Sequence, residues 1–289
     1  MTGAQTGACC RKGVNIIKIQ KVWGICYSAT GNTERAVKIL VEELAAKLDC
    51  PMEQLSFTKP LERSREYHFG ETDLVVVGSP TYAGKLPNKI LPDFQKRLHG
   101  RGALALPVVT FGNRNYDNAL AELCSLLEAN GFHTVAAGAF VAQHAMTDEL
   151  GYGRPGWSDQ FEMKGFAGRV ALKVQGLTAV PEPIRVPGDP EAPYYVPKGT
   201  DGEPVNFLKA KPKTHLKKCT NCGACARFCP MGAIDSRDFS KITGTCIKCQ
   251  RCVRKCTKGA KYFDDPAMLD HVAMLEREFA EPKDNEMFL

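Results

Sequence analysis

Residues 28 to 33 read SATGNT, and this loop lies between the apolar stretch KVWGICYS (21 to 28) and the amphipathic stretch NTERAVKILVEELAAKL (32 to 48). The first stretch has the composition of a buried strand, and the second has the apolar spacing of a helix. The pattern continues, with strands predicted at 52–57, 73–80, 103–112 and 133–143 and helices at 88–98, 116–131 and 158–176. Apolar strands that alternate with helices favour a parallel sheet covered on both faces. The sequence therefore predicts a doubly wound α/β domain.

The SATGNT loop has the features of an anion site. It lies at the carboxyl end of the first predicted strand, which is where such sheets bind ligands, and it opens the first predicted helix. Its side chains offer three hydroxyl groups, Gly31 permits a tight turn, and the free N–H groups of a helix N-terminus favour an anion. The loop contains no lysine and lacks the GxxxxGK[ST] pattern, so we predict a monoester phosphate. The alternative is a Ser/Thr-rich helix cap without a ligand.

Two further loops lie at the same edge of the predicted sheet. The third and fourth strands end in SPTYAGKLP (79 to 87) and TFGNRNYDN (110 to 118), which bring Tyr82 and Tyr116 to that edge. Together with the [ST]-x-T-G-x-T loop, these segments resemble the flavodoxin family. The resemblance implies a flavodoxin-like fold and FMN as cofactor, with the phosphate on Ser28, Ala29, Thr30, Gly31, Asn32 and Thr33. It also implies that the isoalloxazine ring is lined by Pro80, Thr81, Tyr82, Ala83, Gly84, Gly112, Asn113, Arg114, Asn115 and Tyr116.

Arg114 departs from this family's pattern, because flavodoxins that act only as carriers are usually acidic around the flavin. Two orientations of Arg114 are open from the sequence. It either points at the N1/C2=O end of the ring, where its charge would raise the flavin potential, or it points to solvent.

Eight of the thirteen cysteines form two runs with the spacing C-x2-C-x2-C-x3-C. They read CTNCGACARFC (219 to 229) and CIKCQRCVRKC (246 to 256), and the second repeats the first 27 residues later. This is the run of bacterial ferredoxins, in which the fourth cysteine ligates the other cluster. The resemblance implies that Cys219, Cys222, Cys225 and Cys256 hold one [4Fe-4S] cluster, and that Cys246, Cys249, Cys252 and Cys229 hold the other. A pair of zinc sites is the alternative. Thr257 stands where the usual proline follows the second run.

The remaining composition favours a protein of a reducing compartment. No apolar run approaches the ~20 residues that span a bilayer, and the first residues lack the apolar core of a signal peptide. We therefore expect a cytoplasmic protein whose cysteines bind metal rather than form disulfides. Cys26 and Cys124 are predicted to be small core residues, and Cys9 and Cys10 fall in a tail. None of the six histidines has metal or triad spacing, so no catalytic residue is predicted.

These features divide the chain into five predicted segments. Residues 1–19 form an N-terminal tail, 20–178 a flavodoxin-like FMN domain, and 179–212 a proline-rich linker. Residues 213–265 form a small α+β ferredoxin-like domain with two [4Fe-4S] clusters, and 266–289 a C-terminal helix and tail. Residues 179 to 213 hold eight of the 18 prolines, so this segment is an extended linker or a strap over a neighbour. The tail has helical apolar spacing at Met268, Val272, Leu275 and Phe279.

Charge gives an expectation about partners. Between Lys209 and Lys261 there are fourteen Lys or Arg residues and two Asp, whereas the rest of the chain has twenty-four basic and thirty acidic residues. A nucleic acid is a poor candidate, because the basic residues alternate with cluster ligands and few aromatic residues accompany them. We expect the basic end to meet an acidic redox protein or the chain's own acidic domain, and no membrane.

The two cofactor types together suggest a function. FMN accepts two electrons together or releases them singly, whereas a [4Fe-4S] cluster passes one at a time. The chain resembles the flavodoxin and ferredoxin fusion proteins of anaerobes, which implies an electron-transfer protein that relays electrons between the clusters and FMN. The alternative is an FMN-dependent reductase of a small molecule, fed through the clusters, with a pocket formed by Tyr82, Arg114 and the loop at 144–157.

Overall fold

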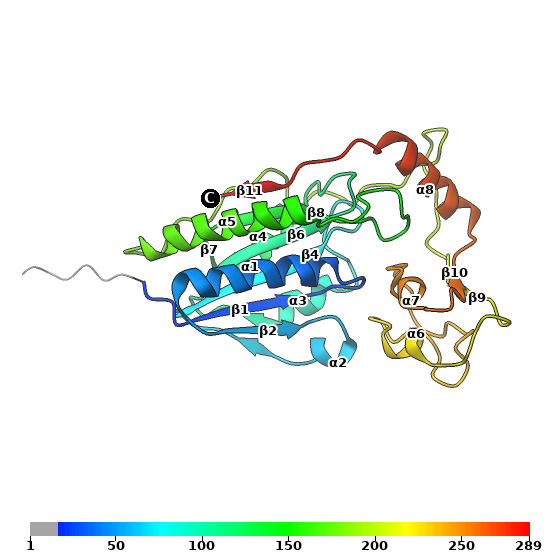
Figure 1. Ribbon diagram of the computed structural model, residues 1–289, viewed down its shortest axis with the longest axis horizontal. Coiled ribbons are helices and arrows are strands. Elements are labelled where there is room, and N and C mark those ends of the chain that lie inside the picture. The colour runs from blue at the N-terminus through cyan, green and yellow to red at the C-terminus, as the bar shows by residue number, and fades with distance from the viewer. Residues whose placement is uncertain (1–16) are drawn as a thin grey trace, which may run out of the picture.

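The large sheet fixes the fold class (Figure 1). The computed structural model describes residues 17–289, so residues 1–16 of the predicted tail, with Cys9 and Cys10, lie outside the described residues. The strand order is β11-β8-β6-β4-β1-β2, and β7 also pairs with β6. The long parallel strands, taken in chain order, follow the arrangement 2-1-3-4-5, which is that of flavodoxin-like sheets. The predicted α/β fold is confirmed, with β1 (Lys21–Cys26), β2 (Met52–Ser56), β4 (Asp73–Pro80), β6 (Leu104–Phe111) and β8 (Ala137–Val141).

Helices cover both faces of the sheet. One face is buried under α1 (Asn32–Leu48) and α5 (Trp157–Gln175), and the other under α3 (Leu91–Arg97) and α4 (Ala119–Ala129). Helix α1 lies very close to β4, because a Cβ atom at Gly78 would be only 2.4 Å from the side chain of Val37. This close approach fixes the start of α1 over the carboxyl ends of the strands. No helix between residues 17 and 289 is long and apolar enough to cross a membrane.

Several short elements were not predicted from the sequence. They are α2 (Pro60–Arg63) and the parallel pair β3 (Tyr67–His68) and β5 (Leu98–His99). The strand predicted at 133–143 is divided into β7 (His133–Thr134) and β8. Strands of two residues are too short to show the alternation that marks a strand.

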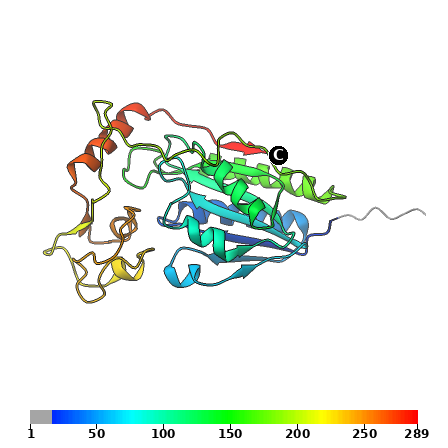
Figure 2. The same cartoon turned by 180° about the vertical axis from the view of Figure 1, so that it is seen from behind.

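The proline-rich segment is a strap along the large domain rather than a free linker (Figures 1 and 2). The hydroxyl of Tyr194 donates to the carbonyl of Leu86 at 2.8 Å, and the N–H of Tyr195 donates to the carbonyl of Ala83 at 2.9 Å. Earlier in the segment, the N–H of Ile184 donates to the hydroxyl of Thr134 at 3.1 Å. Backbone N–H groups of this segment that have no partner in a helix or sheet thus form hydrogen bonds with the surface of the large domain.

The cysteine-rich part forms a small unit beside the carboxyl ends of the strands (Figure 1). Its strands β9 (Lys213–Thr214) and β10 (Lys261–Tyr262) are antiparallel, and an isolated bridge joins Ile234 and Ile242. Each cysteine run contributes one helical turn, α6 (Ala224–Arg227) and α7 (Arg251–Arg254).

The C-terminal residues return to the large domain. Helix α8 (Pro266–Glu278) is capped by Asp265, whose carboxylate accepts from the N–H of Met268 at 3.0 Å. Met268 and Leu275 of the predicted apolar face are buried. After α8 the chain crosses to the sheet, where β11 (Glu286–Phe288) pairs antiparallel with β8. This strand was not predicted from the sequence.

Candidate cofactor sites

The SATGNT loop is held open by its own side chains. Ser28 is buried, and its hydroxyl accepts from the N–H of Glu34 at 3.1 Å, while its N–H donates to the hydroxyl of Thr58 at 3.0 Å. The hydroxyls of Thr33 and Thr110 are 2.7 Å apart. Gly31, which precedes α1, has a φ of 105°, a conformation that favours glycine. These contacts fix the loop shape and, among the described residues, leave the backbone N–H groups at its tip without acceptors.

Those free groups form a row of donors. Within residues 17–289, the backbone N–H groups of Thr30, Gly31, Asn32 and Thr33 have no hydrogen-bond acceptor. The loop faces open space at this point, because a Cβ atom at Gly31 would meet nothing within 4 Å. Adjacent N–H donors at a helix N-terminus are suited to a phosphate group. The loop therefore fits the phosphate of FMN.

Two buried hydroxyl groups at the same edge also lack partners. Among the described residues, the hydroxyls of Tyr27, which precedes the loop, and Thr81, which follows β4, make no hydrogen bond. Tyr82 packs against the same hydrophobic core, and burial raises its pKa well above the usual value. Buried polar atoms are normally paired, so a polar ligand at this edge would account for both hydroxyls.

The loop after β6 is engaged by the C-terminal segment. The side-chain amide of Asn113 donates to the carbonyls of Phe279, at 2.6 Å, and Glu281, at 3.0 Å. The hydroxyl of Tyr116 donates to Glu286 at 2.6 Å. The polar groups of two predicted ring-lining residues are thus used within the chain.

Arg114 does not point to solvent, which is one of the two orientations expected from the sequence. Its guanidinium group lies 4.1 Å from the ring centre of Tyr195 and forms an ion pair with Asp117. Stacking of a guanidinium group on an aromatic face is favourable, particularly where water is excluded. The proline-rich strap supplies that ring, and its course along the domain could not be foreseen from the sequence.

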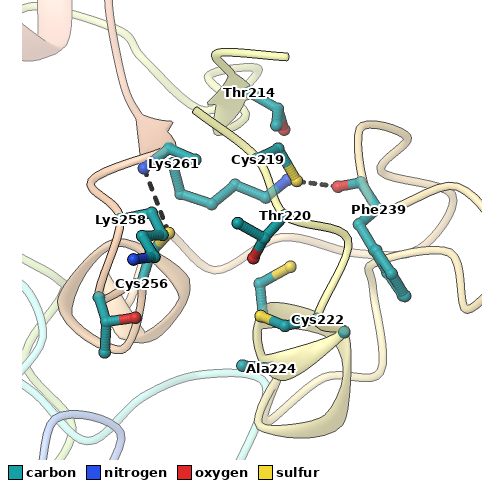
Figure 3. A pocket seen from close by; sticks show the side chains of 13 residues that line it. Thr214, Cys219, Thr220, Cys222, Ala224, Phe239, Cys256, Lys258 and Lys261 are labelled. Atoms are coloured by element: carbon teal, nitrogen blue, oxygen red, sulfur yellow. Dashed lines mark hydrogen bonds between the residues drawn. The ribbon is translucent and has the colours of Figure 1, made fainter. Parts of the chain in front are cut away.

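The eight clustered cysteines line two cavities. Cavity I is lined by Cys219, Cys222, Cys225 and Cys256 (Figure 3). Cavity II is lined by Cys229, Cys246, Cys249 and Cys252. Each cavity therefore has three cysteines from one run and the last cysteine of the other. The structure brings together the two crossed sets that the sequence predicts.

The walls of both cavities suit anionic sulfur. The N–H of Ala233 donates to the sulfur of Cys229 at 3.3 Å, and the N–H of Ala260 donates to that of Cys256 at 3.2 Å. In cavity I the hydroxyl of Thr214 is buried and has no partner among the described residues. Four cysteines around a cavity with inward N–H donors fit a [4Fe-4S] cluster.

The two cavities differ electrostatically. Burial, reinforced by neighbouring cysteines, raises the pKa of Cys249 and of Cys252 to about 12. In cavity I, burial also raises the pKa of Cys225. Burial would raise that of Cys256 too, but the backbone N–H groups of Lys258, Ala260 and Lys261 lower it below its usual value.

Cavity II lies against the large domain. Cys249 packs on the hydrophobic core that includes Tyr82, and Arg251 donates to the carbonyls of Ser28, at 2.9 Å, and Ala29, at 2.5 Å. The residues of cavity II thus touch the loop that fits a phosphate. No feature of the sequence distinguishes Arg251 from the other basic residues.

A second arginine of α7 fixes the loop after β8. Arg254 donates from Nε to the carbonyl of Ala145 at 3.1 Å, donates to the carbonyl of Thr147 at 2.8 Å, and forms an ion pair with Asp148. The loop that the reductase hypothesis assigns to a substrate pocket is thus bound to the cysteine-rich unit.

His144 in this loop gives a pH prediction. It lies over Gly112, where a Cβ atom would be 2.2 Å from its ring. Burial, together with the positive charges of His271, Arg254 and Arg114, lowers its pKa from 6.5 to about 4. Between these values the unfolded chain binds more protons, so stability falls as pH decreases. We expect His144 to lower the free energy of unfolding by on the order of 2 kcal/mol at pH 5 relative to pH 7.

The measurement is the urea midpoint of the wild type and of His144→Asn at pH 7 and pH 5. Between pH 7 and pH 5, the urea midpoint of the variant should decrease by less than that of the wild type. Equal decreases in the two proteins would contradict the assignment.

Comparisons with known proteins match two separate parts of the chain. A family model for a 4Fe-4S binding domain matches residues 212–235. The chain contains a 4Fe-4S binding domain. The matched segment holds the first cysteine run, and the strand order assigns the large domain to the flavodoxin-like fold. The architecture is therefore that of a flavodoxin/ferredoxin fusion, in keeping with an iron–sulfur electron-transfer protein.

Solved structures similar to the chain cover about half of it. A flavodoxin from the domain Archaea is 17% identical, over 54% of this chain and 99% of that one, with a TM-score of 0.38. The two-electron reduced flavodoxin of Megasphaera elsdenii is 14% identical, over 52% and 98% (TM-score 0.35). The apo form of an NADH:FMN oxidoreductase is 13% identical, over 55% and 91% (TM-score 0.37). No curated protein sequence matches the chain.

Proposed function

We propose that this protein relays electrons between two [4Fe-4S] clusters and FMN. The cysteines of cavities I and II hold the clusters, and the loop at 28–33 holds the FMN phosphate. FMN exchanges electrons singly or in pairs and each cluster exchanges one, so the bound groups would connect one-electron and two-electron partners.

The contact of cavity II with the SATGNT loop is the observation that carries this proposal. Arg251 follows Cys249 by two residues and donates to Ser28 and Ala29. Arg63 of the large domain donates to the carbonyl of Pro230, next to Cys229, at 2.9 Å. These contacts support a fixed junction between one cluster and the flavin.

The reductase alternative receives no such support. It requires Arg114 and the loop at 144–157 to be free beside the flavin. Arg114 is instead stacked on Tyr195, and Arg254 binds the start of the loop. The relay is therefore the function that the geometry favours.

An anaerobic reductive titration tests the relay. The reconstituted protein should contain about eight iron atoms and one FMN, and should take up about four electrons per chain, two at the flavin and one at each cluster. Visible absorbance and electron paramagnetic resonance (EPR), followed together, assign the electrons to each group. Zinc in place of iron, or about two electrons in total, would contradict the proposal.

The surface near cavity I is a candidate docking site for an acidic redox protein. Lys217 and Lys218 precede Cys219, and Lys255 and Lys258 flank Cys256. All four lysines are exposed, and none forms an ion pair within residues 17–289. We propose that these lysines attract the acidic surface of a one-electron partner, because complementary charge steers association.

Reversing two of these charges should slow electron exchange with an acidic ferredoxin. We expect Lys217→Glu/Lys218→Glu to lower the second-order rate by about tenfold or more at low ionic strength, and the deficit to shrink at high salt. The control, Lys89→Glu/Lys164→Glu, makes the same charge change on exposed sites of the large domain. Equal losses in the two variants would argue against a docking site at cavity I.

A further inference from the structure

The internal repeat allows the two cavities to be compared position by position. The last cysteine of each run is followed five residues later by a buried residue that lines the same cavity. After Cys229 this residue is Ile234, in cavity II, and after Cys256 it is Lys261, in cavity I. Their exposed fractions are 7% and 3%. Equivalent positions therefore hold a buried aliphatic group in one cavity and a buried amine in the other.

Lys261 lies along the wall of cavity I (Figure 3). Its ammonium group donates to the carbonyl of Phe239, and no carboxylate pairs with it among residues 17–289. Thr214, its partner across the β9-β10 ladder, contributes the unpartnered hydroxyl described above. A buried cation with no anionic neighbour is costly, unless an anionic group occupies the cavity beside it.

Cavity II has apolar side chains at the matching place. Ile234, the repeat equivalent of Lys261, bridges to Ile242, whereas Lys261 pairs with Thr214. Three other cations lie near cavity II. Lys211 donates to the carbonyl of Ile242 at 3.3 Å, Lys248 donates to that of Leu208 at 3.2 Å, and Arg251 donates to the SATGNT loop. None of the three is buried as Lys261 is.

We propose that Lys261 gives a cluster in cavity I a higher reduction potential than a cluster in cavity II. This inference rests on the two-cluster part of the proposed function. Reduction adds one negative charge to a cluster, and an ammonium group in a desolvated wall stabilises that charge. The internal repeat supplies no counterpart in cavity II. The higher potential thus belongs to the cluster in cavity I, which is the cavity beside the exposed docking lysines.

Potentiometric titration followed by EPR tests this assignment on the fully reconstituted protein. The wild type should show two separate potentials. Lys261→Gln keeps a hydrogen-bond donor and removes the charge, so we expect the higher potential to fall, with a change of about tenfold or more in that reduction equilibrium. Lys261→Arg should retain the separation. Ile234→Val is the matched control in cavity II and should leave the higher potential in place.

Iron content separates failure of this inference from failure of the relay. About eight iron atoms per chain, with both potentials unchanged in Lys261→Gln, would overturn the role of Lys261 and leave the relay intact. The same holds if Lys261→Arg behaves as Lys261→Gln does. A wild type with about four iron atoms, or with zinc, would instead overturn the two-cluster proposal itself.

Discussion

Replacement of both Cys219 and Cys256 by alanine is expected to remove one cluster and leave about four iron atoms per chain. Both residues line cavity I, so the double variant leaves that cavity with two cysteines and leaves cavity II complete. Cys219→Ala/Cys229→Ala removes one cysteine from each cavity, and we expect it to perturb both clusters. Iron analysis and the number of EPR signals on reduction measure the difference.

The two double variants also exclude the uncrossed arrangement. If each cysteine run held its own cluster, Cys219→Ala/Cys229→Ala would spare the second cluster and Cys219→Ala/Cys256→Ala would damage both. The two outcomes would therefore be exchanged. Cys50→Ala is the control, because Cys50 lies outside both cavities and should leave the iron content unchanged.

The main strands were predictable because each is an apolar run bounded by turn residues. Helix α1 begins and ends at the residues predicted from its apolar spacing, and β4 likewise matches its prediction. Strand β11 was not predictable, because its three residues form a strand only through pairing with β8 and the bond between Glu286 and Tyr116. Its stability is a property of the tertiary structure rather than of its own sequence.

The same distinction applies to the candidate sites. The crossed cysteine sets follow from spacing, since three ligands on a short loop leave one corner of a cluster to a distant residue. The contacts that join the cysteine-rich unit to the large domain do not follow from the spacing of any motif. Arg251, Arg254 and Arg63 all donate to backbone carbonyls, including that of Ser28. A carbonyl oxygen is present at every residue, so the sequence carries no mark of which ones are contacted.

Introducing a carboxylate into the SATGNT loop is expected to abolish tight FMN binding. Thr30 belongs to the row of free N–H donors, so the side chain of Thr30→Glu would place a negative charge beside the phosphate. Repulsion between close like charges amounts to several kcal/mol at protein surfaces, which corresponds to a loss of about 100-fold or more in affinity. Thr30→Gln has nearly the same shape without the charge, and it should bind FMN much more tightly than Thr30→Glu. Fluorescence titration of the flavin-free protein measures both affinities.

Riboflavin, which lacks the phosphate, distinguishes a charge effect from damage to the loop. If the loop binds the phosphate, the ratio of Thr30→Gln to Thr30→Glu affinities should be large for FMN and close to one for riboflavin. A similar loss for both flavins would mean that the substitution distorts the site. Equal FMN affinities in the two variants would place the phosphate elsewhere. The electron relay would then lose its structural basis, because the contact of Arg251 with Ser28 and Ala29 is what sets cavity II beside the flavin.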